Sequence, residues 1–397
     1  MYFNWRGFLH DLWISIVPKG HPHLRLTGHR ARVVVMLVFC MAWMGGSARV
    51  GLIVDHLLFP WFRRRRVVAP TFIVGNFRSG STLLHRLLAH SSAFTAMKTW
   101  ELYFAPSITQ RKFWHGVWIV DRWFGGHLRS AIVRAQARRL GQVQMHKVRL
   151  EEPEEDEALF LYLWDSFFNW FFVPADADLN PYWRFDDRVP LHRRRAAMRF
   201  YRGILQRHLA LAPPGVTYLS KSPAFTARLG SLIEEFPDAR IVELVRHPFD
   251  VIPSGAAWFA FAWHYFASPV DRFPFLDTFL SMVKEWYLRP ERVIAASDHA
   301  GTYHRVRYGE LVAHPSATVT GLLHALGLDA DAELRERLVQ LELAADRPRS
   351  HSLSLADLGL SRESVASTMS DVFTLLGYDP DHGAVPDLDD DDSAESL

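Results

Sequence analysis

The chain has 397 residues, of which 49% are hydrophobic and 13% aromatic, so it can hold two ordinary domains or one large α/β domain with additions. Its 45 basic and 43 acidic residues nearly cancel, and a net charge of +2 lacks the signature of a nucleic-acid partner. The single cysteine, Cys40, excludes an intrachain disulfide and any cysteine-based metal cluster, and it fits a reducing compartment such as the cytoplasm.

Residues 33–62 are the most apolar part of the chain. Residues 33–48 carry no charge, and Arg49 and Asp55 then interrupt the run, which falls a little short of the ~20 apolar residues of a spanning helix. Arginines flank the run, at Arg30 and Arg32 before it and at Arg63, Arg64, Arg65 and Arg66 after it. Such a helix is typical of the membrane interface, so we expect peripheral or attached membrane binding through residues 33–62. The alternatives are a buried helix that covers the sheet and a hydrophobic dimer face.

A buried strand, a glycine-rich turn and a helix follow one another in residues 71–84, which read TFIVGNFRSGSTLL. Residues 71–74 are an apolar, β-branched run, Gly75 and Gly80 bracket a four-residue loop, and leucines then recur at helical spacing. This arrangement directs backbone N–H groups and the positive end of a helix toward one point, and that geometry binds phosphate. A glycine turn without a ligand is the alternative.

The loop departs from a nucleotide P-loop in the position of its cation. The two glycines have the P-loop spacing, but Ser81 stands where a kinase or NTPase has the lysine that contacts the β- and γ-phosphates. The positive charge lies inside the loop instead, at Arg78. The loop can therefore still hold one phosphate-like group, while ATP chemistry is disfavoured.

Acidic and aromatic residues fill the middle of the chain. An acidic run at residues 151–157 precedes an aromatic helix that the pattern predicts over residues 158–172. Because the helix dipole favours acidic residues at a helix N-terminus, a structural role explains most of this charge.

Predicted strands end at or just before three separate cations, Arg78, Lys221 and Arg246. Ligands of open α/β sheets bind beyond the carboxyl ends of the strands, so we expect these three side chains to converge at one edge. The expected fold is a three-layer, P-loop-like α/β fold. It has a central parallel sheet of four or five strands, helices on both faces and a helical N-terminal addition.

These segments resemble the sulfotransferase family. Residues 72–84 look like the family's 5′-phosphosulfate-binding loop, and residues 246–254, RHPFDVIPS, look like its 3′-phosphate-binding segment. Shorter segments resemble the bacterial branch that also includes the tyrosylprotein sulfotransferases: TWEL from Thr99, EPEEDE from Glu152, LSKSPA from Leu219, YGELVAHP from Tyr308 and HSLSLADLGL from His351. The resemblance covers roughly residues 70–375, and it departs from the family pattern at His247 and Gly309, where acidic residues are usual.

The resemblance implies a donor, 3′-phosphoadenosine 5′-phosphosulfate, whose sulfuryl group passes to a hydroxyl or an amine without a metal. It implies that Arg78 stabilises the leaving bridging oxygen and that Lys221 neutralises charge at the reacting group. The implied donor-binding residues are Ser79, Gly80, Ser81 and Thr82 at the 5′-phosphate, Arg246 and Ser254 at the 3′-phosphate, and Ser354 with His351 as a late closing element. Because the transferred group is anionic and moves in line, catalysis would rest mainly on positioning and charge stabilisation.

The acceptor must lose a proton, so a general base is expected. Glu101 is the first choice, because the resemblance places a catalytic glutamate a little over 20 residues after the loop arginine. A plain helix-start carboxylate is the alternative explanation of Glu101. His146 and Glu155 are the other candidates for the base.

The domain boundaries follow from these assignments. We expect an N-terminal arm and apolar helix over residues 1–66, a sulfotransferase domain over 67–380 and a disordered acidic tail over 381–397. Aromatic density and the apolar N-terminal segment favour a small-molecule or lipid-like acceptor, with a glycan or a protein tyrosine still open. The competing functions are a P-loop small-molecule kinase and a catalytically silent, membrane-attached binding protein.

Overall fold

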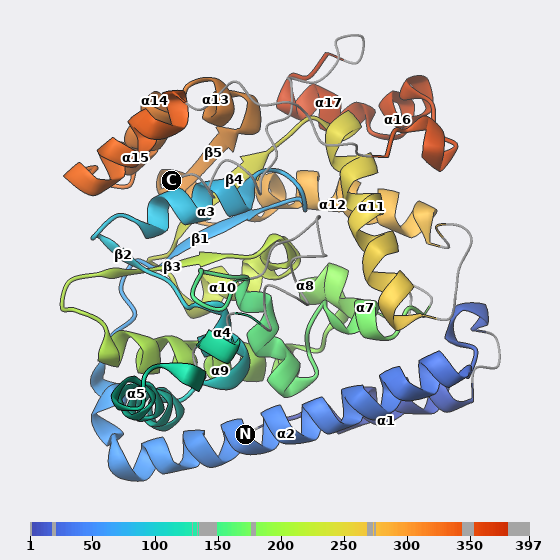
Figure 1. Cartoon of the computed structure of the whole chain (residues 1–397). Helices are drawn as coiled ribbons and strands as arrows, with labels where there is room; N and C mark the ends of the chain where they lie inside the picture. The colour runs from blue at the N-terminus through green and yellow to red at the C-terminus, as the bar shows by residue number, and fades with distance from the viewer. Residues whose placement is uncertain are drawn as a thin grey trace.

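A five-stranded parallel sheet lies at the centre of the computed structural model (Figure 1). The structure describes residues 2–17, 21–128, 130–132, 134, 149–175, 180–267, 273, 275–343 and 353–379. The strands are β1 (Thr71–Gly75), β2 (Phe94–Thr95), β3 (Thr217–Lys221), β4 (Arg240–Val245) and β5 (Tyr303–Arg307), in the order β2-β3-β1-β4-β5. The predicted parallel sheet is therefore confirmed.

The register of the central strands aligns their carboxyl ends. Ile73 of β1 lies beside Lys221, the last residue of β3, and Gly75 at the end of β1 lies beside Leu244 of β4. Because all pairs are parallel, the segments that follow β1, β3 and β4 leave the sheet at the same edge. This edge receives the loops that carry the predicted cations.

Helices cover both faces of the sheet and make the predicted three layers. On one face, Ile73, Leu219 and Val242 pack against α3 (Ser81–Ala89), α13 (Tyr308–Ala313), α14 (Pro315–Ala325) and α15 (Ala332–Leu343). On the other face, Phe72, Tyr218 and Ile241 pack against α9 (Leu191–Leu211), α10 (Leu229–Glu235), α11 (Pro248–Phe266) and α12 (Leu276–Ala295). Successive strand residues point to opposite faces, so each strand serves both cores.

The remaining elements connect or flank these layers. They are the helices α4 (Thr99–Phe104), α5 (Ile108–Trp123), α7 (Asn169–Phe172), α8 (Phe185–Arg188), α16 (Arg362–Thr368) and α17 (Ser370–Leu376). Short 3-10 helices occur at Pro22–Leu24, Pro60–Arg64, Asp156–Leu163, Pro181–Arg184, Pro223–Arg228, Ala300–Thr302 and Ala356–Leu358.

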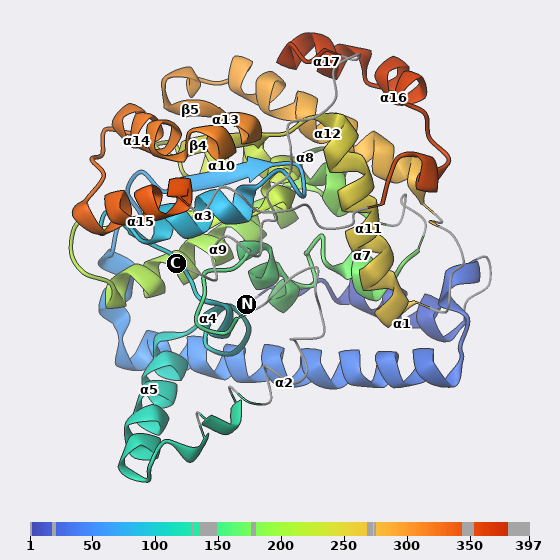
Figure 2. The same cartoon turned by 45° about the horizontal axis from the view of Figure 1, so that its top comes forward.

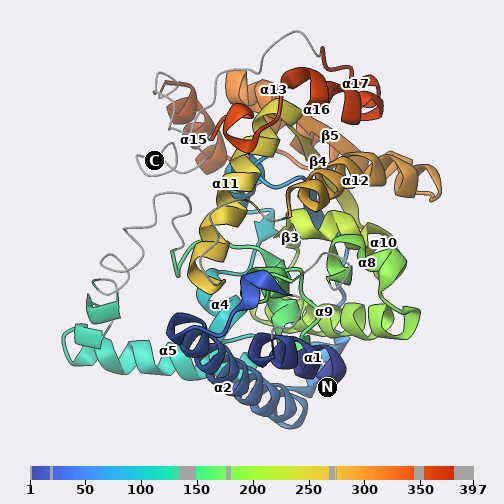
Figure 3. The ribbon, with the colours of Figure 1, turned by 90° about the vertical axis from the view of Figure 1, so that its right-hand side faces the viewer.

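The N-terminal addition is helical, as predicted, and consists of α1 (Trp5–Ile16) and α2 (Gly28–Leu58). α2 is the one helix of the described residues that is long and apolar enough to cross a membrane, although 28% of its most apolar window is buried in the protein. It runs along one whole side of the domain, beside α1 and α5 (Figures 1 and 3). The apolar run predicted over residues 33–62 thus lies mostly within one longer helix.

The prediction of a single helix over residues 158–172 is wrong. This segment forms the 3-10 helix Asp156–Leu163, and Trp164 then adopts a left-handed conformation with φ of 55° before the short α7 begins. The chain turns here because a buried carboxylate captures the backbone that would otherwise continue the helix.

That carboxylate belongs to Glu157, which is fully buried. It accepts hydrogen bonds from the Phe167 backbone N–H (2.6 Å), the Ser166 hydroxyl (3.0 Å) and the Arg228 guanidinium (2.8 Å). The guanidinium of Arg228 also lies over the Phe160 ring, 3.9 Å from its centroid. Burial raises the pKa of Glu157 to about 7, and the Arg228 charge opposes this shift.

We expect Arg228→Met to lower the free energy of unfolding by about 3–5 kcal/mol, because it leaves a buried carboxylate without its cation. The loss is largest above pH 7, where Glu157 has to be ionised. Urea denaturation at pH 8 measures it. The double variant Glu157→Gln/Arg228→Met serves as the control and should recover part of the loss, and a cost below about 1 kcal/mol for the single variant contradicts this account.

Candidate active site

The turn between β1 and α3 is tight because its two glycines leave no room for a side chain. Gly75 has a φ of +130°, and a Cβ atom there would lie 2.3 Å from the carbonyl oxygen of Leu244. Gly80 has a φ of +88°, and a Cβ atom there would lie 2.3 Å from the Tyr308 ring. The loop backbone can approach β4 and Tyr308 this closely only with glycine at both positions.

α3 begins at Ser81 directly after this turn, and no side chain caps its first turn. The first N–H groups of α3 therefore remain available to an anion, and the helix dipole favours one there. Ser81 is buried and Thr82 half-buried in this turn. Ser79 is fully buried, and its hydroxyl donates to the Asn76 carbonyl (2.7 Å), so it braces the loop from inside.

The structure brings Arg78, Arg246 and Ser254 into contact. Arg78 has a φ of +60°, and its Nε donates to the Ser254 hydroxyl on α11 (3.0 Å). Arg246 follows β4, and its Nη1 donates to the Arg78 carbonyl (3.0 Å) while its guanidinium lies 4.4 Å from the Tyr308 ring centroid. The side chains predicted to contact the two ends of the donor thus form one cluster.

Lys221 ends β3 and is almost completely buried. Its Nζ lies 2.8 Å from Oε1 of Glu155 and 3.7 Å from Oε1 of Glu154. Oε2 of Glu155 is buried and has no hydrogen-bond partner among the described residues. Glu155 therefore holds the ammonium group with one oxygen, while its other oxygen is enclosed without a hydrogen-bond partner among the described residues.

His85 on α3 lies close to the same lysine and is fully buried. Burial lowers the pKa of His85 to about 3, and the Lys221 charge adds to the shift. The imidazole is therefore neutral at any physiological pH. His85 was not predicted from the sequence, because a histidine in an apolar helix gives no signal of its own.

Glu101, the first choice for the general base, caps a helix and lies beside an arginine and a histidine. Its Oε2 accepts from the Lys98 backbone N–H (2.8 Å) and so caps the start of α4. Its Oε1 lies 3.4 Å from Arg111, and His208 lies 4.0 Å from Oε2. These contacts correspond to the helix-start explanation of this residue.

Glu101, Arg111 and His208 line a cavity of about 520 Å³ between α4, α5 and α9. His208 contacts Thr95 of β2, and Thr95 is paired with Tyr218 of β3. Tyr218 precedes Lys221 by three strand residues, which span roughly 10 Å. The cavity of Glu101 thus lies beside the outer strand β2, while Glu155 contacts Lys221 at the carboxyl end of β3.

The late element predicted to close over the donor is only partly described. Ser354 lies in an exposed turn, where its hydroxyl donates to the Asp357 carboxylate (2.7 Å). His351, named with it, and His146, the third candidate for the base, lie outside the described residues.

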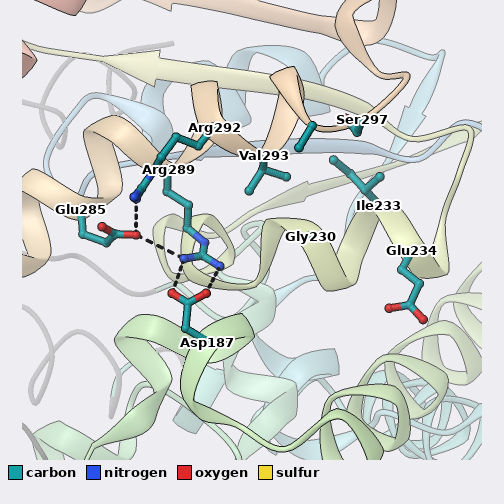
Figure 4. A pocket seen from close by; sticks show the side chains of 10 residues that line it. Asp187, Gly230, Ile233, Glu234, Glu285, Arg289, Arg292, Val293 and Ser297 are labelled. Atoms are coloured by element: carbon teal, nitrogen blue, oxygen red, sulfur yellow. Dashed lines mark hydrogen bonds and ion pairs between the residues drawn. The ribbon is translucent and has the colours of Figure 1, made fainter.

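A second cavity, of about 530 Å³, lies between α8, α10 and α12 (Figure 4). Its central cation is already neutralised, since Arg289 lies 2.7 Å from Asp187 and 3.2 Å from Glu285. Glu285 also pairs with Arg292 (2.5 Å). The lining has three carboxylates, Asp187, Glu234 and Glu285, and only two arginines, so it holds an additional anion poorly and is the weaker candidate.

The cluster at the carboxyl edge can bind and stabilise a strongly anionic ligand. The guanidinium groups of Arg78 and Arg246, the ammonium group of Lys221 and the start of α3 all follow or end strands at the carboxyl edge of the sheet, and Glu155 lies against Lys221. The contacts of Tyr308 with both Gly80 and Arg246 were not predicted, although the residue lies in a segment that the sequence analysis singled out. In the described part of the chain, no group of three or more His, Cys, Asp or Glu side chains could hold a metal ion.

Comparisons with known proteins agree with this chemistry. A family model described as "Sulfotransferase family" matches residues 70–332. The chain is 24% identical over 341 residues to Omega-hydroxy-beta-dihydromenaquinone-9 sulfotransferase Stf3 of Mycobacterium bovis, which covers 82% of this chain and 81% of that protein. Crystal structures of sulfotransferase STF9 from Mycobacterium avium and STF1 from Mycobacterium tuberculosis match with TM-scores of 0.71 and 0.70. They are 16% and 20% identical and cover 94% and 93% of this chain, and 97% and 92% of their own, so they show a shared fold.

We expect acid to destabilise the protein partly through His85. Its pKa in the folded state lies below the ordinary value of 6.5, so the unfolded chain binds a proton that the folded chain excludes. The resulting stability is present above pH 6.5 and is lost as the pH falls toward 3, by up to about 1.4 kcal/mol per pH unit. Urea denaturation at pH 7.0 and 5.5 should therefore show a larger loss in the native protein than in His85→Gln. The exposed His324→Gln is the matched control, and equal losses in all three proteins would rule this role out.

Proposed function

The chain belongs to the sulfotransferase family, and we propose that it transfers the sulfuryl group of 3′-phosphoadenosine 5′-phosphosulfate to a hydroxyl of a lipid-like acceptor. The observation that carries this proposal is the contact of Arg78, Arg246 and Ser254 at the edge where Lys221 also ends its strand. A donor with two phosphate positions and a sulfuryl group needs several cations at that edge.

The donor would be held by residues of this chain at both ends. Arg246 and Ser254 bind the 3′-phosphate, and the open N–H groups of Gly80, Ser81 and Thr82 bind the 5′-phosphate. Arg78 then leaves Ser254 and turns to the bridging oxygen, where negative charge grows as the bond from sulfur to that oxygen breaks. The site uses positioning and charge stabilisation, and the reaction needs no metal.

Glu155 is our preferred proton acceptor. The acceptor oxygen forms a bond to sulfur and gives up its proton, and Oε2 of Glu155 is a carboxylate oxygen beside Lys221 that no hydrogen bond from the described residues occupies. Lys221 neutralises the reacting group and holds Glu155 in place. Glu101 is the second candidate, because its two oxygens already contact Lys98 and Arg111. His146 remains an untested candidate.

A lipid-like acceptor is favoured by the aromatic surroundings of the loop. Phe77 stacks on the half-buried Trp258 of α11, with 5.4 Å between ring centroids, and Phe171 meets Trp258 edge to face at 4.6 Å. Rings at this position can line an apolar path to the reacting edge. The Mycobacterium bovis relative is named for a menaquinone-derived lipid, which supports the same acceptor class here.

The domain organisation is consistent with an enzyme that works at a membrane surface. We assign residues 67–380 to the catalytic domain, residues 1–66 to an addition and residues 381–397 to an acidic tail that lies outside the described residues. β1 at Thr71 and α17 at Leu376 bound the catalytic elements. We place the protein in the cytoplasm, peripherally attached through residues 33–62.

Adenosine 3′,5′-bisphosphate should raise the melting temperature without Mg²⁺, because a ligand that binds only the folded state adds RT ln(1 + [L]/Kd) to its stability, about 2.7 kcal/mol at 100 times Kd. Arg246→Ala should lose this shift. Arg240→Ala, at the other end of the same strand, is the matched control and should keep it. A shift with ATP–Mg²⁺ alone would favour the competing small-molecule kinase.

Glu155→Gln should lower kcat by about 100-fold or more while the Kd for the bisphosphate stays within about twofold, because a general base typically contributes 10²–10⁴-fold. Transfer to a polyprenyl alcohol in detergent, followed by mass spectrometry, measures kcat. Glu101→Gln is the matched control, with an expected change below about threefold. The opposite pattern would assign the proton transfer to Glu101, and no turnover in any form would favour a silent binding protein.

A further inference from the structure

α2 has an inner face that is fixed to the catalytic domain. Leu37, Ala48 and Leu52 are buried on this face, at helical spacing. The helix therefore has one side covered by protein along its length, which a helix surrounded by lipid would not have.

Buried charges fix both ends of α2. Near the start, Arg30 is fully buried and donates to the carbonyls of Phe172 (2.7 Å) and Phe266. Near the end, Asp55 is fully buried and accepts from Arg207 Nε (2.9 Å).

Asp55 also holds the start of α5. Its carboxylate accepts from the backbone N–H groups of Ile108 (2.9 Å) and Thr109 (2.8 Å), in the first turn of that helix. Pulling either end of α2 away from the domain would leave a buried charge without its partners, at a cost of several kcal/mol. α2 is therefore held flat against the domain over its whole length.

The outer face of α2 is apolar and exposed. Side chains recur there every three or four residues or a multiple of this spacing, at Met36, Phe39, Trp43, Val50, Ile53 and Leu57, and each is at least half exposed. Residues at this spacing share one face of a helix. α2 thus has one apolar stripe that packs against the protein and a second apolar stripe that is exposed and can contact another medium.

The neighbouring helices continue the outer apolar face. Trp5, Leu9 and Trp13 recur along α1 and are exposed, as are Phe113 and Trp123 on α5. The views in Figures 2 and 3 place α1, α2 and α5 on the same side of the molecule, with α5 extending beyond the domain. Most exposed large hydrophobic side chains of the described residues lie in this part of the chain.

The charged residues around this surface indicate what kind of partner it binds. The exposed cations on or next to the three helices are Arg6, Arg25, Arg32, Arg63, Arg64, Arg66, Lys112 and Arg122. The acidic residues within the three helices are Asp11, Asp55 and Asp121, and Asp55 is buried. Arginine and tryptophan around an apolar stripe are what an anionic lipid interface binds.

We propose that α1, α2 and α5 form a docking face that lies in the plane of an anionic bilayer, with α2 resting in the interface instead of crossing it. The purpose of this docking rests on the proposed function, since docking would bring the active site to acceptors dissolved in the membrane. Vesicle binding itself needs neither donor nor turnover, so the two proposals fail independently.

Flotation of the full chain with vesicles tests the docking face. The protein should float with phosphatidylglycerol–phosphatidylcholine vesicles and bind pure phosphatidylcholine at least about tenfold less well. Phe39→Ser/Trp43→Ser should lose about tenfold or more of the binding, and Val339→Ser, a half-exposed apolar position on α15, is the matched control. Both variants should keep the native melting temperature and its shift with the bisphosphate.

Depth measurements distinguish a flat helix from a spanning one. In a Cys40→Ser background, Val35→Cys, Val50→Cys and Leu57→Cys are labelled with an environment-sensitive fluorophore and quenched by lipids spin-labelled at two depths. A flat helix gives three similar, shallow depths. Clearly different depths would overturn the proposal. A protein that does not bind vesicles would also overturn the proposal, as would a protein that forms a dimer which the substitutions Phe39→Ser/Trp43→Ser disrupt.

Discussion

The parallel pairing of β3, β1 and β4 forces three cationic segments to one edge of a sheet, and the site depends on this. Lys221, Arg78 and Arg246 come from distant parts of the chain and would repel one another there. The structure offsets the repulsion with carboxylates, since Glu155 lies 2.8 Å from Lys221 and Asp250 lies 3.5 Å from Arg246. An anionic donor would enter a site where Lys221 and Arg246 are already in place, so Arg78 is the one cation of the three that has to move.

The site also depends on the irregular segment that follows residue 155. Asp156 is fully buried and accepts hydrogen bonds from the hydroxyls of Tyr201 (2.5 Å) and Tyr218 (2.8 Å), while Glu157 holds Arg228. Burial raises the pKa of Asp156 to about 6, although both hydrogen bonds lower it. Two consecutive side chains are thus fixed in the core, and they hold the preceding Glu155 against Lys221.

The local patterns predicted the parts of the structure that depend on short stretches of sequence. The strand, glycine turn and helix at residues 71–84, and the convergence of the strand ends, followed from spacing alone. The prediction of a helix over residues 158–172 failed because the buried carboxylate of Glu157, which no periodicity reveals, accepts the backbone N–H of Phe167. The surroundings of Glu101 depend on Arg111 and His208, and sequence spacing could not show which face of α4 meets them. The two apolar stripes of α2 look alike in the sequence, so only packing identified the outer one.

The proposed function requires that one edge of the sheet binds a sulfuryl donor through Arg246, Ser254 and the loop of Arg78. A crystal structure of the protein with adenosine 3′,5′-bisphosphate tests this most directly. We expect the 3′-phosphate to lie against Arg246 and Ser254, the 5′-phosphate to lie against the start of α3, and the Arg78 side chain to have left Ser254. A nucleotide bound elsewhere, with the contact between Arg78 and Ser254 intact, would rule out this donor site.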